Sequence, residues 1–486
     1  MNIGRFHQFH TAFASGYGSF IRSMFISWPS YTTEIYSSNT TTPLSSPMTK
    51  SEESLLGSLP SLGAMLGVAI TGLVIDNIGR RNGGVLLYIP VLISWVIVNF
   101  TTSIKLVLAA RFLAGISGGS ALVFAPIFTS EVAEDTIRGT LASSSMFLFC
   151  AGILVSYIIG WCMTYKSIIW MNLFFSATCV ALLALVTESP VYLIRQKRDQ
   201  DAKLAIAKYR GVPISSIVVL KEFTKLKEQM APSIELVAVT EADTKLENAE
   251  KRNLQNEDIT LTKQISTSPF KLLFLEPASR KAFIVVAIVM SIQVFMGNVP
   301  VQVYAKSVFI ETDPTKADLY TILFAVVMFF GAAISAAITD KIGRRILLIS
   351  SSGSVFVSLI ILGYLLQYKI APPLVSVFTI LLYSFSFMFG AGTIPFVLMA
   401  EAFIPEVQSL ASIIINELFW LLSFFILAVF PYMNSAFGIY GTFYIFGVVG
   451  LVNAIFTYFY LPETNGLSNA QIHDVFLSRK NRLMRI

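Results

Sequence analysis

Charged residues are scarce in this sequence. Asp, Glu, Lys and Arg make up 13% of its 486 residues, whereas hydrophobic residues make up 55%. An ordinary soluble domain carries about 25% charged residues, so this composition excludes a soluble enzyme with a modest core. It also excludes a disordered chain, which needs low hydrophobicity. A lipid bilayer is the solvent that this composition fits.

Cysteine and histidine are also scarce, at three residues each. Cys150, Cys162 and Cys179 form no CxxC pair, which excludes a disulfide framework and a thiolate metal cluster. Three histidines leave little material for a metal site or a general base, and the sequence has no P-loop and no HExxH motif. We therefore expect no metal, no cofactor and no enzymatic activity.

The net charge of +6 does not indicate nucleic-acid binding. Most Lys and Arg residues lie between apolar runs rather than on one basic face, so they report membrane topology instead. We expect a lipid bilayer as the environment and no nucleic acid as a partner.

Twelve apolar runs are long enough to cross a bilayer, which takes roughly 20 residues per helix. The first run is interrupted by Arg22 and lacks the pattern of a removable signal peptide, so we expect it to remain as a signal anchor. The fold class predicted is an all-α polytopic membrane protein with twelve transmembrane helices in two six-helix halves. The runs cover residues 10–28, 55–75, 84–102, 106–127, 140–161, 167–186, 282–302, 318–338, 346–366, 374–399, 410–432 and 439–460.

The polar stretch between the sixth and seventh runs is expected to be a central loop. Within it, residues 201–230 combine charges with apolar residues at helical spacing, which predicts one or two surface helices. Residues 238–265 are expected to be flexible. The predicted organisation is an N-terminal half at 1–186, a cytoplasmic loop with short helices at 187–281, a C-terminal half at 282–460 and a cytoplasmic tail at 461–486.

Orientation follows from the loop charges. With the N-terminus in the cytoplasm, the short inner segments hold 11 Lys and Arg and the outer segments hold 6. The triplet Asn39-Thr40-Thr41 falls in the first outer loop and is a glycosylation acceptor. We predict a multi-pass glycoprotein of the cell membrane with both termini in the cytoplasm.

A motif of Asp-x-x-Gly-Arg-Arg occurs twice, beginning at Asp76 and at Asp340, 264 residues apart. Two further pairs of similar short segments follow corresponding apolar runs of the first and second halves of the sequence. The two halves are therefore parallel copies. Such copies are typical of a carrier that rocks around a substrate held between its halves. The motif residues are expected to form clusters that tie helix ends together, rather than only to cap helices and set topology. They are Asp76, Arg80, Arg81, Glu131, Arg138, Glu188, Asp340, Arg344, Arg345, Glu401 and Glu463.

The ordered set of motifs resembles the sugar porter family of the major facilitator superfamily. Within that family, the chain is similar to the facilitated trehalose transporter-like members of arthropods. The resemblance implies that Arg111, in the pair Arg111-Phe112, stabilises the outward end of its helix bundle. The other motifs that carry the resemblance are DNIGRR, Glu131 with Arg138-Gly139, Glu188-Ser189-Pro190, DKIGRR and the segment Pro462-Glu463-Thr464-Asn465-Gly466.

The sugar-contacting positions of that family fit this chain unevenly. Val294 and Val299 stand where the family has glutamine and asparagine, and Phe396 replaces a tryptophan. A site with fewer hydroxyl partners accepts less hydroxylated solutes. Some candidates could instead form hydrogen bonds between helices. The candidate substrate-binding residues are Gln293, Asn298, Gln302, Tyr304, Thr393, Phe396, Asn416 and Trp420.

Two ionisable residues lie inside predicted spans without a family counterpart. Arg22 could extend its charge to the outer interface, or could face the central cavity and attract an anionic or hydroxyl-rich solute. Glu417 could pair with Arg22 or Arg111, or could take up a proton. The first span contains no Asp or Glu, and the resemblance implies that proton-coupled members carry an aspartate there.

We therefore expect a facilitative carrier, a uniporter of sugars such as hexoses or trehalose, that works by alternating access and functions as a monomer. The alternatives that the sequence leaves open are a proton-coupled sugar symporter, a porter of another small polar solute and a non-transporting solute receptor.

Overall fold

The protein is described by a computed structural model that covers residues 3–134, 137–230, 269–467 and 469–478. Within these ranges the chain is helical and contains no strand. The expected flexible segment at 238–265 lies outside the described residues.

The long helices agree with the predicted spans. Ten of them are long and apolar enough to cross a membrane, and one of these, α20, is 56 residues long and holds two crossings that meet at the non-helical Gly438. α1 adds a further helix of 25 residues, or about 37 Å, which accounts for twelve crossings. The predicted all-α twelve-helix fold is confirmed. The crossings are α1 (Ile3–Ser27), α3 (Lys50–Ile78), α4 (Arg80–Phe100), α5 (Ile104–Val132), α6 (Arg138–Cys162), α7 (Tyr165–Leu185), α13 (Pro277–Phe295) with α14 (Asn298–Val303) and α15 (Ala305–Ile310), α16 (Ala317–Ile342), α17 (Arg344–Tyr368), α18 (Pro373–Ser386) with η1 (Phe387–Ala391) and α19 (Ile394–Glu401), and α20 (Pro405–Tyr460).

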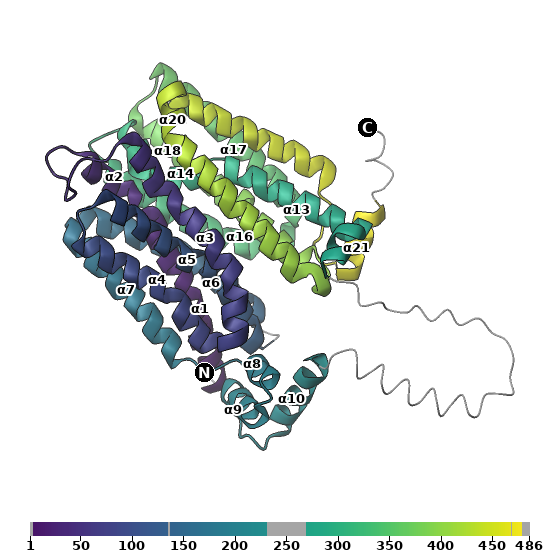
Figure 1. Cartoon of the computed structure of the whole chain (residues 1–486). Coiled ribbons are helices and arrows are strands. Elements are labelled where there is room, and N and C mark those ends of the chain that lie inside the picture. Colours follow the sequence, from purple (N-terminus) through teal and green to yellow (C-terminus); the bar gives the residue numbers. More distant parts are fainter. Residues whose placement is uncertain (1–2, 135–136, 231–268, 468, 479–486) are drawn as a thin grey trace, which may run out of the picture.

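The crossings form two side-by-side sets. In the first set, α3 packs against α5, α1 against α6, and α4 against α7; in the second set, α20 packs against α17 and α13. Figure 1 shows the first set in purple and blue and the second in green and yellow. The two sets meet along α3 with α20 and along α6 with α16.

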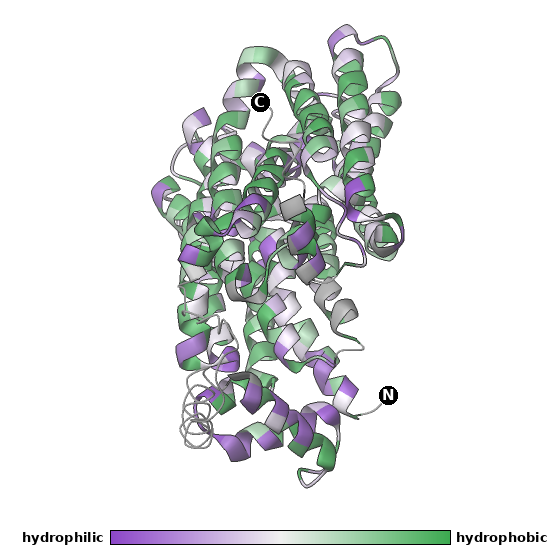
Figure 2. Cartoon of the chain, turned by 90° about the vertical axis from the view of Figure 1, so that its right-hand side faces the viewer, coloured by the Kyte–Doolittle hydropathy of each residue, from purple (hydrophilic) through white to green (hydrophobic). Residues whose placement is uncertain are grey.

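Short helices mark the two ends of the molecule. α2 (Pro29–Ser37) lies at one end, which we call the α2 face. Hydrophilic residues gather on the short helices of the opposite end, whereas the long helices are mostly hydrophobic (Figure 2). We call this opposite end the α8 face. Its short helices are α8 (Pro190–Arg195), α9 (Asp199–Arg210), α10 (Ile217–Met230), α12 (Pro269–Leu275) and α21 (Asn469–Ser478).

The predicted surface helices of the central loop are confirmed as α9 and α10. With α8 they enclose a small apolar cluster of their own that includes Leu193, Ile206 and Phe223. This cluster explains why a charged segment folds, because its apolar residues at helical spacing bury one face of each helix.

Two crossings of the second set are interrupted at mid-length. α13 ends before Gly297, which has a φ of 87°, a left-handed conformation that favours glycine. A Cβ atom at Gly297 would lie 2.1 Å from the ring of Phe446, so the close packing also requires glycine there. The tenth crossing changes from α18 through the π-helical turn η1 to α19, which begins with Pro395 in its first turn. Most of the candidate substrate-binding residues lie at or next to these breaks.

Candidate functional site

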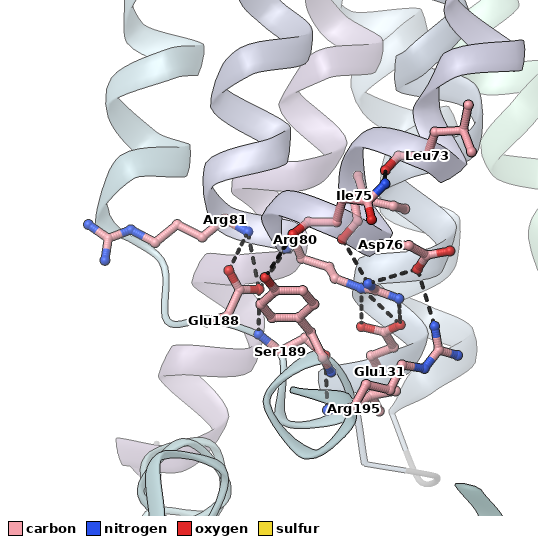
Figure 3. Close-up of polar contacts among 12 residues, drawn as sticks. Leu73, Ile75, Asp76, Arg80, Arg81, Glu131, Glu188, Ser189 and Arg195 are labelled. Carbon is pink, nitrogen blue, oxygen red and sulfur yellow. Dashed lines mark hydrogen bonds and ion pairs between the residues drawn. The ribbon is translucent and has the colours of Figure 1, made fainter. Parts of the chain in front are cut away.

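Arg80 is the centre of a polar cluster at the α8 face of the first set (Figure 3). The residue is 2% exposed and its guanidinium donates to both oxygens of Glu131, with Nη2 at 2.7 Å from Oε1 and Nε at 2.9 Å from Oε2. Nη1 donates to Asp76 Oδ1 at 3.0 Å, and Arg195 reaches the same oxygen at 3.2 Å. One buried cation thus joins α3, α4 and α5, and α8 adds a second cation at the rim.

Glu188 closes the cluster from the segment after α7. Its carboxylate accepts the backbone N–H groups of Arg80, at 2.7 Å, and of Arg81, at 3.1 Å, which belong to the first turn of α4. These N–H groups have no partner within the helix, so a carboxylate there caps it. Burial raises the pKa of the Glu188 carboxyl, and the N–H donors oppose that rise.

The second set repeats this cluster. Arg344 Nη2 donates to Glu401 Oε1 at 2.8 Å, and Nη1 donates to Asn465 Oδ1. Glu463 accepts the backbone N–H of Arg344 at 2.8 Å and that of Arg345 at 3.1 Å. Arg344, Glu401 and Glu463 therefore occupy the roles of Arg80, Glu131 and Glu188, as the internal repeat predicts.

The glycine of each motif has a structural reason. Gly79 has a φ of 104° and Gly343 has a φ of 96°, which are values that favour glycine. A Cβ atom at Gly79 would lie 2.5 Å from Glu188 Oε2, and one at Gly343 would lie 2.7 Å from Glu463 Oε2. The motif thus combines a turn between two crossings with room for a capping carboxylate.

Not every predicted member joins these clusters through its side chain. Arg81 contributes its backbone N–H, and its side chain points away from the cluster in Figure 3. Arg345 Nη2 donates to Tyr458 O at 2.6 Å. The side chains of Arg138 and Asp340 lie outside the part of the molecule that the structure describes.

Arg111 lies toward the opposite end of the first set. It is 2% exposed, donates through Nε to Leu56 O at 2.9 Å and through Nη1 to Phe25 O, and lies over the Trp28 ring at 5.4 Å. It thereby links α5 to α3 and α1 through carbonyl oxygens. The sequence gives no signal for these partners, since any residue supplies a carbonyl.

Six of the eight candidate substrate-binding residues share one feature. Each is at most 5% exposed and has a buried polar atom with no hydrogen-bond partner among the described residues. Such atoms cost free energy unless something pairs with them, and in most proteins they are rare. The atoms are Gln293 Oε1, Asn298 Oδ1, Gln302 Nε2, Tyr304 Oη, Asn416 Oδ1 and Trp420 Nε1.

Among these six residues, Gln293 has a side-chain amide whose direction is fixed by a hydrogen bond. Its Nε2 donates to Gly392 O at 3.0 Å, which links α13 to the interrupted tenth crossing and fixes the direction of the amide. The other amide atom, Oε1, is left as an acceptor. An amide held in this way is pre-oriented to accept a hydroxyl donor.

Trp420 lies where the two sets meet. It packs against Ala64 and Val68 of α3 and lines a cavity of about 20 Å³ together with Arg111 and Val299. This cavity has room for about one water molecule, which is far less than a sugar needs. The structure therefore brings the two sets into close contact at Trp420.

The remaining two candidates are placed differently. Thr393 is half-buried, and its hydroxyl lies 2.7 Å from that of Ser335, a bond between helices of the second set. Phe396 is half-buried and packs edge-on against Phe419, with ring centroids 5.7 Å apart. Thr393 thus has the helix-to-helix contact that the sequence left as an alternative.

Arg22 and Glu417 form no ion pair with each other or with Arg111 in the described residues. Arg22 is 8% exposed, its guanidinium lies 4.5 Å from the centre of the Phe149 ring, and its Nε has no partner. Glu417 is half-buried, with Oε1 buried and unpaired. The pairing that the sequence left open is therefore not present here.

Hydrogen bonds between the two sets within the described residues lie at the α2 face. Tyr157 Oη donates to Gln302 O at 2.6 Å, and Ser54 Oγ donates to Ala428 O at 2.7 Å. Lys306 forms an ion pair with Glu34 at 3.3 Å, across the sets. The sequence gives no signal for these contacts, because none of the residues belongs to a motif and two of the three acceptors are backbone carbonyls. The described structure is closed at the α2 face.

The predicted glycosylation acceptor is accessible. Asn39 is exposed in the turn that follows α2. It therefore lies at the α2 face, opposite the two charge clusters.

Comparisons with known proteins agree with this architecture. The family model described as "Sugar (and other) transporter" matches residues 6–476. Facilitated trehalose transporter Tret1 of Polypedilum vanderplanki is 25% identical over 459 residues, which covers 93% of this chain and 85% of that protein. Facilitated trehalose transporter Tret1-2 homolog of Drosophila sechellia is 26% identical over 440 residues, which covers 89% of this chain and 83% of that protein.

Solved structures show the same fold. The inward open conformation of the xylose transporter XylE from E. coli superimposes with a TM-score of 0.75 at 20% identity, covering 96% of this chain and 99% of that one. The partially occluded inward open conformation of the same transporter superimposes with a TM-score of 0.74 at 20% identity, covering 95% of this chain and 99% of that one. Since the family model matches nearly the whole chain, this protein belongs to the sugar transporter family, on the major facilitator fold.

Proposed function

We propose that this protein is a facilitative carrier of sugars such as hexoses or trehalose. The observation that supports this most is the set of six polar atoms, on α13, α14, α20 and the intervening Tyr304, that are buried without a partner among the described residues. A sugar presents several hydroxyls, each a donor and an acceptor, and would pair with such atoms. Membership of the sugar transporter family and similarity to the trehalose transporters support the same substrate class.

The proposed mechanism is alternating access. Each six-helix set has its own charge cluster at the α8 face, and the hydrogen bonds between sets lie at the α2 face. Rocking the two sets would break the latter bonds and bring the clusters together. Each surface pair contributes only about 0–1 kcal/mol, so several contacts are needed to bias such an equilibrium.

We propose that the α8 face is cytoplasmic and the α2 face extracellular. The Lys and Arg excess of the loops and the exposed Asn39 at the α2 face support this orientation. The proposal includes the cell membrane as location, both termini in the cytoplasm, the division into halves at 1–186 and 282–460, glycosylation at Asn39 and function as a monomer.

The test is counterflow exchange of labelled glucose and trehalose by purified protein in proteoliposomes without an ion gradient. Exchange of either sugar is the expected result. If folded protein binds a sugar but exchanges none, the chain is a receptor, and the proposal fails. If it exchanges another polar solute instead, the substrate class is wrong.

Gln293→Ala is expected to reduce exchange by about fivefold to a hundredfold. The change removes the acceptor and the bond to Gly392, and a lost hydrogen bond to a polar substrate costs about 1–3 kcal/mol. Counterflow initial rates measure it. Ser291→Ala is the matched control on α13, because its hydroxyl donates to Ala287 O within the same helix. Equal rates for the Gln293 variant and wild type would remove Gln293 from the site.

Proton-coupled symport is the second candidate, and one observation favours it. Glu417 Oε1 is buried and unpaired inside the eleventh crossing, where a carboxyl has a reason to be protonated. We nevertheless expect Glu417→Gln to change uptake less than twofold, with or without an imposed pH gradient. Uptake that is strongly driven by the gradient and abolished by this variant would establish symport.

A further inference from the structure

A cavity of about 200 Å³ opens at the α8 face of the first set, away from the candidate substrate-binding residues. It lies between the start of α1, the end of α7 and α9. Since a water molecule takes about 30 Å³, there is room for a phosphate group and several further polar atoms. Its lining consists of Phe6, His7, His10, Thr11, Leu185, Val186, Thr187 and Lys208.

The polar lining favours an anion. Lys208 carries a positive charge, and His7 and His10 each offer an N–H donor whether neutral or protonated. None of these three side chains has an ion pair or hydrogen bond in the described residues, and no carboxylate lines the cavity. Two nearby carboxylates have partners of their own. Glu134, after the end of α5, is held by Gln8, at 3.1 Å, and by Arg5, and Glu188, which follows Thr187, accepts the backbone N–H groups of Arg80 and Arg81.

The three elements around the cavity are held in place independently of any ligand. Gln8 Nε2 donates to Tyr209 O at 2.7 Å, and Tyr209 Oη donates to Thr187 O. A Cβ atom at Gly4 would lie 2.3 Å from the carbonyl carbon of Arg210, so α1 and α9 pack backbone to backbone. The cavity is therefore a formed site rather than a gap between mobile segments.

The rim of the cavity is apolar and exposed. Phe6 is 55% exposed and Leu185 is 72% exposed, and both stand at the end of helices that cross the membrane. Ile3 extends the apolar surface of α1 at 70% exposed. Cationic and donor groups beside exposed apolar side chains match a molecule with an anionic head and hydrocarbon chains.

We propose that this cavity binds the headgroup of a negatively charged membrane phospholipid. Lys208, His7 and His10 hold the phosphate, and the acyl chains lie along Phe6 and Leu185. A bound lipid contacts α9, α1 and α7 together, and so adds to the direct contacts that already hold the helical loop unit against the first set. This site does not depend on which solute the protein carries.

The test is lipid binding to full-length purified protein by native mass spectrometry, with dioleoylphosphatidylserine and dioleoylphosphatidylcholine as probes. We expect wild type to bind the serine lipid more tightly. Lys208→Gln is expected to weaken that binding about fivefold, since one basic residue near a lipid surface is worth about 1 kcal/mol. His10→Ala removes the N–H donor that α1 contributes and should weaken that binding as well.

Lys203→Gln is the matched control, because Lys203 lies on the same helix but stacks on the Phe223 ring at 4.9 Å. It should leave both affinities unchanged. Equal weakening by the two lysine variants would overturn the proposal in favour of general surface charge. Inorganic phosphate that binds as tightly as the serine lipid would assign the site to a free phosphate compound instead. Unchanged affinity for the serine lipid in both Lys208→Gln and His10→Ala would exclude the site.

Discussion

Arg80→Ala is expected to lower the free energy of unfolding by about 3–5 kcal/mol and to reduce sugar exchange strongly. Arg80 is 2% exposed and is held by Glu131 and Asp76. Removing it leaves the Glu131 carboxylate, whose side chain is 12% exposed, without its cation. An unpaired buried charge costs far more than the pair itself contributes. The unfolding temperature of the purified protein measures the effect.

Arg81→Ala is the matched control for this variant. Its backbone N–H still donates to Glu188 after the change, and its side chain lies outside the cluster. We expect its unfolding temperature and exchange to remain near those of wild type. Arg344→Ala removes the equivalent cation of the second set and should behave like Arg80→Ala. A smaller effect at Arg80 than at Arg81 would contradict the role of the buried cluster.

Gly57→Val is expected to prevent closure of the α2 face. Gly57 belongs to α3 of the first set, and a Cβ atom there would lie 2.4 Å from Tyr304 Oη and 3.3 Å from Val303 Cγ1 of the second set. The larger side chain therefore keeps the two sets apart at this end. We expect counterflow exchange to fall at least tenfold, because alternating access requires both closures.

The state of the α2 face is measured by labelling. A single cysteine at Ser61, which lines the narrow cavity beside Trp420, should react with an impermeant thiol reagent only when this face is open. The exposed Cys162 is replaced by serine in this background. Labelling should increase in Gly57→Val and remain low in Gly72→Val, because Gly72 lies on the same helix with nothing within 4 Å of a Cβ atom. Unchanged labelling in Gly57→Val would show that the larger side chain does not hold the α2 face open, and the prediction would be wrong.

The charge clusters were predictable from the sequence for a local reason. Each motif lies at a turn between two crossings. A glycine with positive φ makes the turn, and the first backbone N–H groups of the next helix then point out of its start in a fixed direction. A carboxylate such as Glu188 or Glu463 then has a defined partner. The contribution of Asn465 to Arg344 was not predictable, since the second cluster uses an amide that the first cluster lacks.

The candidate substrate site was only partly predictable. The sequence identified Gln293 and Trp420, and the structure leaves a buried polar atom of each unpaired. It could not separate these from Thr393, because a hydroxyl in a membrane helix bonds to another helix as readily as to a ligand. That distinction depends on Ser335, 58 residues away in the chain.

Composition and the apolar runs by themselves determined that this chain spans a membrane with twelve helices. Hydrocarbon forces every backbone group to be satisfied within a helix, so the length and number of apolar runs are sufficient for that conclusion. The motif that occurs at Asp76 and again at Asp340 determined that the helices form two repeated sets. Only the tertiary structure decided which end is closed and where the cavity lined by His7, His10 and Lys208 lies. Both depend on contacts such as Tyr157 with Gln302 and on the convergence of α1 with α9, which join residues 145 and about 200 positions apart. No local pattern encodes such contacts, because they arise from how finished helices pack.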